Sequence, residues 1–300
     1  MFEKLVSWEM ALRGGNARAH AGKLIRRVWP DFRLSNFLLR TTGSRKMVVV
    51  NGKKMFVDLR DSAVATHLFV SKTWEPEETK LVSRLLEEGD VFVDVGANLG
   101  YFTLIASDAV GKTGRVFAFE PEPNNFSLLQ KNVEVNKCAN VCCERKAVSN
   151  ANQPIELHLS SFNYGDHRIY SSHDDEGYNR GEERARTQVE GVTLDSYFPS
   201  GTRIDFIKMD VQGAEYFALL GMERVLRENV DVVLMVEFWP HGLREAGVEP
   251  SAFLEKVVGP GLVPFRIDGE KLVRWSVDGI LQTSGDDCVN LVLSRRRLDD

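Results

Sequence analysis

Three acidic side chains follow apolar segments at points where a buried strand would end. Asp94 opens "DVGANLGYF" (94–102), Glu120 ends "VFAFE" (116–120), and Asp210 lies within "IDFIKMDVQGAE" (204–215). Ligands of open α/β sheets bind outside the carboxyl ends of the strands. The spacing therefore predicts that these three carboxylates surround one ligand.

The glycines between these acids indicate what that ligand is. Gly96 permits a sharp turn out of the strand, and Gly100 lets the next helix pack closely, which leaves backbone amides free for a ligand. Glu120 follows Gly100 by twenty residues in the sequence. This is about the sequence separation at which an acid binds both hydroxyls of a ribose. Together these residues predict a nucleoside pocket.

The turn around Asp94 differs from the dinucleotide-binding motif, and the differences indicate which kind of nucleoside binds. A pyrophosphate binder needs G-x-G-x-x-G without an acid nearby, whereas this turn has Asp94 and no middle glycine. A carboxylate instead favours a ligand with an ammonium or sulfonium group, such as S-adenosylmethionine. A nicotinamide-dependent oxidoreductase and a non-catalytic nucleoside-binding scaffold remain as alternatives.

The elements that position these residues alternate between helix and strand. The apolar pattern predicts strands over 90–95, 115–120, 141–147, 204–209, 231–237, 262–267 and 289–295, and helices over 77–87, 100–109, 123–136, 214–227 and 250–258. Continuous apolar strands such as "DVVLMVEF" are typical of sheets covered on both faces. The expected fold is a doubly wound α/β domain over 73–300, preceded by an extension over 1–72 with helices and a hairpin around Asn51-Gly52.

Composition limits the cellular setting and the partners. The net charge is −5, but residues 1–46 carry ten Lys or Arg against three acids. This basic arm could meet an anionic surface, although we favour a solvated helical appendage. We expect no nucleic acid, because its binding would need a broader basic face with exposed aromatic residues. No apolar run reaches transmembrane length, and four scattered cysteines favour reduced thiols, so we expect a cytoplasmic protein.

Four motifs resemble those of the FkbM-type methyltransferases, a branch of the class I S-adenosylmethionine-dependent enzymes. They are "FVDVGANLGYFTL", "AFEPEP", "KAVSN" and "IDFIKMDVQGAEYFALLG", and the similarity runs from about residue 73 to 239. The resemblance implies a Rossmann-like, mostly parallel seven-stranded sheet whose last strand is antiparallel. It also implies O-methylation of a hydroxyl on a sugar or natural product.

The resemblance further assigns cofactor contacts by position. The methionine end would meet the turn after the first strand, the ribose would meet Glu120, the adenine would lie along the segment after the third strand, and Glu75 would close the site. The implied cofactor-binding residues are Glu75, Asp94, Gly96, Ala97, Asn98, Gly100, Glu120, Pro121, Ala147, Val148, Ser149 and Asp210.

Methylation of a hydroxyl benefits from a base that takes its proton. The candidates are Asp210, Glu237 and His167, of which the first two end neighbouring strands. Two facing carboxylates could also bind a divalent ion, but Phe238 stands where a third ligand such as asparagine would be useful, so we predict no metal. For Glu215 we favour a helix-start role, because an acid suits a helix N-terminus.

The segment 171–186 is strongly charged and nearly free of aromatic residues. Such composition is typical of a solvated surface loop, and a substrate lid is the functional alternative. The preceding polar cluster, Asn163 with Asp166, His167 and Arg168, could hydrogen-bond a hydroxylated acceptor, with Trp239 opposite it.

Overall fold

The computed structural model describes residues 44–171, 184–285 and 287–298. The helices predicted in the basic arm and most of the predicted lid over 171–186 lie outside the described residues. Within the described part of the chain, no helix combines the length and apolar character that crossing a membrane requires.

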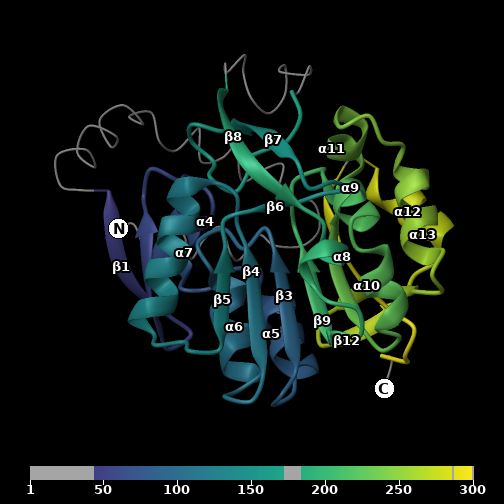
Figure 1. The fold of residues 1–300 in the computed structure, drawn as a ribbon, viewed down its shortest axis with the longest axis horizontal. Helices are drawn as coiled ribbons and strands as arrows, with labels where there is room; N and C mark the ends of the chain where they lie inside the picture. The colour runs from purple at the N-terminus through teal and green to yellow at the C-terminus, as the bar shows by residue number, and fades with distance from the viewer. Residues whose placement is uncertain (1–43, 172–183, 286, 299–300) are drawn as a thin grey trace.

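The centre of the molecule is a mixed sheet of eight strands (Figure 1). Their order across the sheet is β12 (Lys271–Arg274), β11 (Val263–Asp268), β13 (Val289–Ser294), β10 (Val233–Phe238), β9 (Phe206–Met209), β3 (Val91–Val95), β4 (Arg115–Phe119) and β5 (Val141–Glu144). The five neighbouring strands β10, β9, β3, β4 and β5 run parallel, and β13 is antiparallel to both of its neighbours. This is the expected Rossmann-like arrangement of a mostly parallel sheet.

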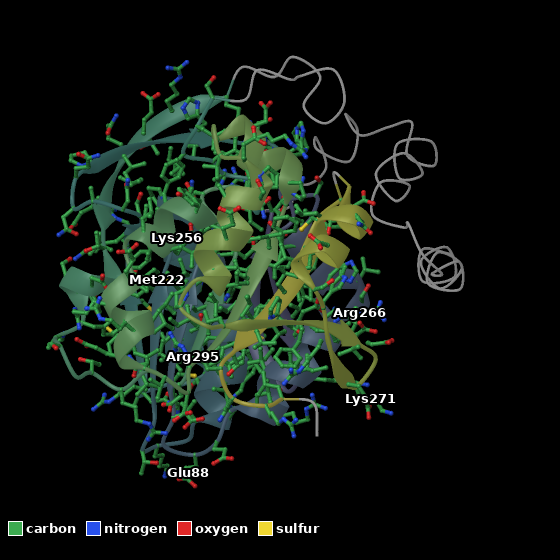
Figure 2. All side chains as sticks on the ribbon, turned by 90° about the vertical axis from the view of Figure 1, so that its right-hand side faces the viewer. Glu88, Met222, Lys256, Arg266, Lys271 and Arg295 are labelled. Atoms are coloured by element: carbon green, nitrogen blue, oxygen red, sulfur yellow. The ribbon has the colours of Figure 1, made fainter. Side chains whose placement is uncertain are left out.

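The predicted count of seven strands was wrong by one edge strand. β12 forms a hairpin with β11 and extends the sheet beyond the predicted strands. Its sequence, "KLVR", is too short and too polar to predict a strand, and three of its four residues are exposed. Figure 2 shows Arg266 and Lys271 at this edge, where charged side chains discourage further strand pairing.

Helices cover both faces of the sheet, as the apolar strands predicted. They are α4 (Val64–Ser71), α5 (Pro76–Leu85), α6 (Tyr101–Ala109), α7 (Pro123–Val135), α8 (Leu194–Tyr197), α9 (Glu215–Leu220), α10 (Glu223–Glu228), α11 (Pro240–Glu245), α12 (Pro250–Val258) and α13 (Val277–Ser284). Helices α4 to α7 pack on one face and α8 to α13 on the other. Alternate residues of β3 enter the two cores: Phe92 belongs to one, whereas Val93 and Val95 belong to the other.

The order of the strands creates a switch point at the middle of the sheet. From β3 the chain continues outward through β4 and β5, whereas β9 and β10 continue on the other side of β3. Loops leaving β3 and β9 therefore diverge and open a crevice at the carboxyl ends of the strands, where α/β proteins bind ligands. Asp94 lies near the end of β3, and Asp210 directly follows β9.

The predicted hairpin is confirmed. Strands β1 (Arg45–Val50) and β2 (Lys53–Asp58) pair antiparallel, and Asn51 and Gly52 occupy the turn with positive φ. The hairpin packs against α7, whose Asn132 and Asn136 side chains bind the β2 backbone. Figure 1 shows the hairpin and α7 at one end of the molecule, with α12 and α13 at the other.

Two regions differ from the predicted elements. The region after β5 contains a small three-stranded sheet of β6 (Ala147–Val148), β7 (Pro154–Leu159) and β8 (Ala185–Val192). The helix predicted over 214–227 is divided into α9 and α10 around Gly221. A Cβ on Gly221 would lie 2.0 Å from the carbonyl oxygen of Ser149, so the chain passes too close to this segment for a larger residue.

Candidate functional site

One cavity of about 820 Å³ occupies the switch point. Its walls include most of the residues predicted from sequence: Glu75, Asp94, Gly96, Ala97, Asn98, Glu120, Pro121, Ala147, Val148, His167, Asp210 and Glu237. Gly100 and Ser149 were also predicted, but they are not among the lining residues. Gly100 starts α6 with φ 92°, and the Ser149 amide donates to Val192, so both shape the backbone behind the wall.

The turn after β3 forms the wall nearest the sheet. A Cβ on Gly96 would lie 2.0 Å from the carbonyl oxygen of Asp210, so glycine allows β3 and the loop after β9 to approach each other. The Asp94 carboxylate is buried, and its Oδ2 accepts a hydrogen bond from Thr103 Oγ1 at 2.6 Å. Asp94 Oδ1 has no hydrogen-bond partner among the described residues, and neither has Ser284 Oγ elsewhere in the cavity wall.

Glu120 lies beside this turn, and backbone amides fix its carboxylate. Oε2 accepts from the Asn98 amide at 2.8 Å, and Oε1 accepts from the Glu122 amide at 2.9 Å. Burial raises the pKa of Glu120 to about 8, although these two hydrogen bonds favour the ionised form. The carboxylate keeps further lone pairs for a hydroxyl-bearing ligand.

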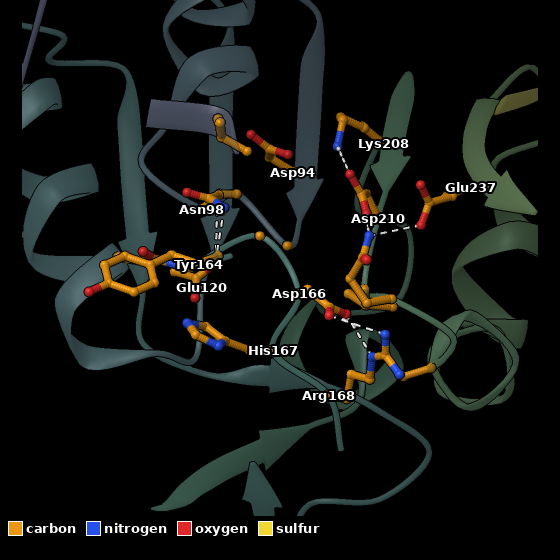
Figure 3. Close-up of a pocket in the computed structure, with 18 of the residues that line it drawn as sticks. Asp94, Asn98, Glu120, Tyr164, Asp166, His167, Arg168, Lys208, Asp210 and Glu237 are labelled. Carbon is orange, nitrogen blue, oxygen red and sulfur yellow. Dashed lines mark hydrogen bonds and ion pairs between the residues drawn. The ribbon is translucent and has the colours of Figure 1, made fainter. Parts of the chain in front are cut away.

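Asp210 and Glu237 are brought together as predicted, and Gln212 joins them. Gln212 Nε2 donates to Asp210 Oδ1 at 2.8 Å and to Glu237 Oε2 at 2.9 Å (Figure 3). Cys288 Sγ donates to the other oxygen of Glu237 at 2.7 Å. The two carboxylates therefore form one hydrogen-bonded group in the cavity wall.

Lys208 supplies a buried positive charge beside this group. Its Nζ lies 3.5 Å from Asp210 Oδ2 and 4.9 Å from the centre of the Phe102 ring. Burial opposes the charged form, but the carboxylates around it, Asp210 and Asp94 above all, raise the pKa of Lys208. The lysine is therefore charged and offsets part of the negative charge of the site.

Glu215 completes a group of three carboxylates whose oxygens lie within 4.8 Å of one another. Both of its oxygens are occupied by the turn before α9, because they accept from the amides of Val211 and Gly213 at 2.9 Å. This geometry matches the predicted helix-start role. The side-chain NH2 group of Gln212 lies between the carboxylates of Asp210 and Glu237 and donates to both, which suits a site without a metal. The absence of a metal stays a prediction.

The structure does not bring His167 to the carboxylate pair. His167 stacks on Tyr164, and its Nδ1 accepts from the Ser160 amide at 3.1 Å. Burial lowers the pKa of His167, and the negative charges of Glu122 and Asp166 oppose this shift. Figure 3 shows His167 beside Glu120, on the far side of the cavity from Glu237. This position favours contact with a bound nucleoside over proton transfer at Asp210.

Sequence reasoning missed several residues of the wall. Lys208 was treated as part of an apolar strand, although a lysine two residues before Asp210 shares its face of the strand and was a usable signal. Gln212, Tyr164 and Cys288 carried no such signal. Their proximity depends on how segments distant in the sequence pack together.

Comparison with known proteins identifies relatives of the chain. Residues 94–252 match the Methyltransferase FkbM domain family. The methyltransferase sdnD of Sordaria araneosa is 27% identical over 195 residues, which cover 56% of this chain and 75% of that protein. The hexuronic acid methyltransferase AglP of Haloferax volcanii is 27% identical over 180 residues, which cover 59% of this chain and 65% of that protein.

Among solved structures, the crystal structure of the FkbM methyltransferase from Methylobacillus flagellatus KT aligns with a TM-score of 0.43 and 15% identity. The alignment covers 75% of this chain and 52% of that chain.

Proposed function

Because the chain belongs to the FkbM methyltransferase family, we propose that it transfers the methyl group of S-adenosylmethionine to a hydroxyl of a sugar or natural-product acceptor. The observation that carries the proposal is the buried Asp94 Oδ1, which lacks a hydrogen-bond partner among the described residues and lies in the cavity wall. A buried acceptor atom without a partner is costly unless a ligand satisfies it. A cationic ligand fits this atom.

The cavity offers complementary groups for each part of the proposed cofactor. Asp94 would accept from the ammonium group, and Glu120 would accept from the ribose hydroxyls. Ala147 and Val148 provide an apolar wall for the adenine, and His167 with Tyr164 provides a stacked pair near Glu120. The cofactor supplies an electrophilic methyl group on a sulfonium. The protein must then hold an acceptor oxygen in line and take its proton.

Asp210 is the proposed base, with Glu237 beside it. Gln212 holds both carboxylates at the cavity wall, and Lys208 holds Asp210 from the other side. A hydroxyl that donates to Asp210 would pass its proton to this carboxylate during transfer. An acceptor of the sugar class agrees with the name of the relative AglP, a hexuronic acid methyltransferase.

Replacement of Asp210 with asparagine tests the assignment. Asp210→Asn keeps the size of the side chain and removes its basicity, so we expect kcat for methyl transfer to fall by about 10²-fold or more. Calorimetry should show cofactor affinity changed much less. Asp268→Asn, at the exposed edge of the sheet, is the control and should leave kcat unchanged. A folded Asp210→Asn enzyme with normal kcat would remove Asp210 from the transfer step.

A chelator tests the metal-free form of the proposal. Activity should persist after treatment with EDTA and dialysis. Loss of activity that magnesium restores would instead make Asp210 and Glu237 metal ligands that lower the pKa of the acceptor hydroxyl.

A further inference from the structure

A buried guanidinium forms part of the cavity wall near the proposed base. Arg168 is only 3% exposed, and it lines the cavity. Its Nε and Nη2 donate to the two oxygens of Asp166 at 2.6 Å and 3.1 Å, and its Cζ lies 4.8 Å from the centre of the Trp239 ring. These contacts on two sides hold the guanidinium in one orientation.

The carboxylate of Asp166 does not neutralise all of the positive charge around it. It also binds Arg184, whose Nη2 lies 2.7 Å from Asp166 Oδ2. Two guanidiniums therefore share one carboxylate, and the three side chains carry a formal charge of +1. Of the two arginines, only Arg168 is among the residues that line the cavity.

Arg168 has donors left for a ligand. Its contacts with Asp166 use the edge formed by Nε and Nη2, and Nη1 has no hydrogen-bond partner among the described residues. The edge formed by Nη1 and Nη2 matches the spacing of two oxygens in a carboxylate or phosphate. A pre-oriented guanidinium of this kind is suited to bind an oxyanion, because little side-chain entropy remains to be lost.

A chain of contacts connects Arg168 to the proposed base. Its Cζ lies 5.8 Å from the centre of the Tyr170 ring, and the Tyr170 hydroxyl donates to the Gln212 carbonyl oxygen at 2.9 Å. The Gln212 side chain in turn bridges Asp210 and Glu237. Figure 3 shows Asp166 and Arg168 on the same side of the cavity as this pair. Arg168 and Asp210 both line this cavity, so a molecule bound to Arg168 can extend toward Asp210 within it.

We propose that the methyl acceptor carries an oxyanion, a carboxylate or a phosphate, close to the hydroxyl that is methylated, and that Arg168 binds this group. The inference rests on the proposed function. It narrows the class of acceptor from hydroxylated compounds in general to compounds that carry a carboxylate or a phosphate close to the methylated hydroxyl. Arg168 is a specificity-determining residue in this scheme. Arg184 serves only to balance Asp166.

Matched ligands that differ in one group test the inference. The methyl glycosides of glucuronic acid and of glucose 6-phosphate represent the two oxyanions, and methyl glucoside is the neutral counterpart. Calorimetry measures the binding of each to the full chain saturated with S-adenosylhomocysteine. We expect at least one charged ligand to bind ten-fold or more tightly than methyl glucoside, and the better of the two identifies the oxyanion.

Two variants separate recognition from structural support. Arg168→Gln should reduce the preference for the charged ligand to about two-fold or less. Arg184→Gln removes the other arginine from the same carboxylate and should retain most of the preference. Thermal unfolding of both variants shows whether each is folded.

The outcomes are distinct. Charged ligands that bind no more tightly than methyl glucoside, or a preference that survives in Arg168→Gln, would overturn the inference. So would an equal loss of preference in a folded Arg184→Gln protein. Failure of the chain to bind S-adenosylhomocysteine at all would instead contradict the proposed function.

Discussion

Glu120 is a carboxyl group whose surroundings oppose its ionisation. Burial raises its pKa to about 8, from an ordinary value of 4.5. Between these values the native state keeps a proton that the unfolded chain has released, so rising pH lowers the free energy of unfolding. We expect the stability of the ligand-free chain to fall from about pH 5 to pH 8, and to fall less steeply in Glu120→Gln. Urea unfolding at a series of pH values measures both slopes, and equal slopes would contradict the pKa shift.

The same carboxylate should contribute to cofactor affinity. Its oxygens already accept from the amides of Asn98 and Glu122, so they are held in place before a ligand arrives. Above about pH 8, where Glu120 is ionised, Glu120→Ala should weaken S-adenosylmethionine binding by about 1.5–3 kcal/mol, the scale of hydrogen bonds to a charged group. Calorimetry is the measurement, and the exposed Glu190→Ala is the control. If a folded Glu120→Ala chain bound the cofactor normally, Glu120 would not be the ribose ligand.

At the scale of single residues, the sequence predicted positions better than contacts. Asp94, Glu120 and Asp210 line one cavity because each stands at a strand end, and strand ends are visible in the apolar pattern. His167, predicted as a candidate base, lines the same cavity, but sequence could not show that its Nδ1 accepts from a backbone amide. Of the partners of Arg168, Asp166 and Tyr170 are two residues away in the sequence, whereas Trp239 comes from a distant segment that no local pattern could reveal.

Among the elements, α7 binds the hairpin through asparagine side chains. Its Asn132 is fully buried: Oδ1 accepts from the Phe56 amide, and Nδ2 donates to the carbonyl oxygens of Phe56 and Leu99. Asn132→Ala would leave these backbone groups without partners, which costs about 1–3 kcal/mol for a buried group. We expect urea unfolding to show this loss of stability.

Asn136 provides a matched control one turn further along the helix. Its side chain binds the backbone N–H and C=O of Lys54 in the same way, but these contacts are exposed, so water can replace the side chain. Asn136→Ala should therefore cost clearly less than Asn132→Ala. An equal cost would show that burial does not decide the contribution of these contacts.

The apolar pattern predicted the parallel strands and the helices between them, because burial on both faces marks them in the sequence. It failed where local sequence is polar or where tertiary contacts divide a helix. β7 and β8 contain few buried residues without regular alternation, and they pair across a long insertion, which hides their partnership. The break between α9 and α10 depends on the close approach of Ser149 to Gly221, a contact between distant segments.

For the whole molecule, the predicted boundary after residue 72 crosses a shared core. Val57 and Leu68 from before the boundary belong to the same buried cluster as Phe92 and Leu104 from after it. The boundary itself stays a prediction. The shared core nevertheless implies that the hairpin and the sheet lose their structure together, since each covers apolar surface of the other.

Two methionines on the hairpin test this cooperativity. Met55 on β2 is 1% exposed within the shared core, whereas Met47 on β1 is 54% exposed. Met55→Ala should lower the free energy of unfolding of the entire chain by about 2–5 kcal/mol, because it leaves a cavity between hairpin and sheet. Met47→Ala should change it by less than about 0.5 kcal/mol. Circular dichroism and tryptophan fluorescence, followed through urea unfolding, should report one coincident transition in each variant. A Met55→Ala transition that splits into two steps would show that the hairpin unfolds independently of the sheet.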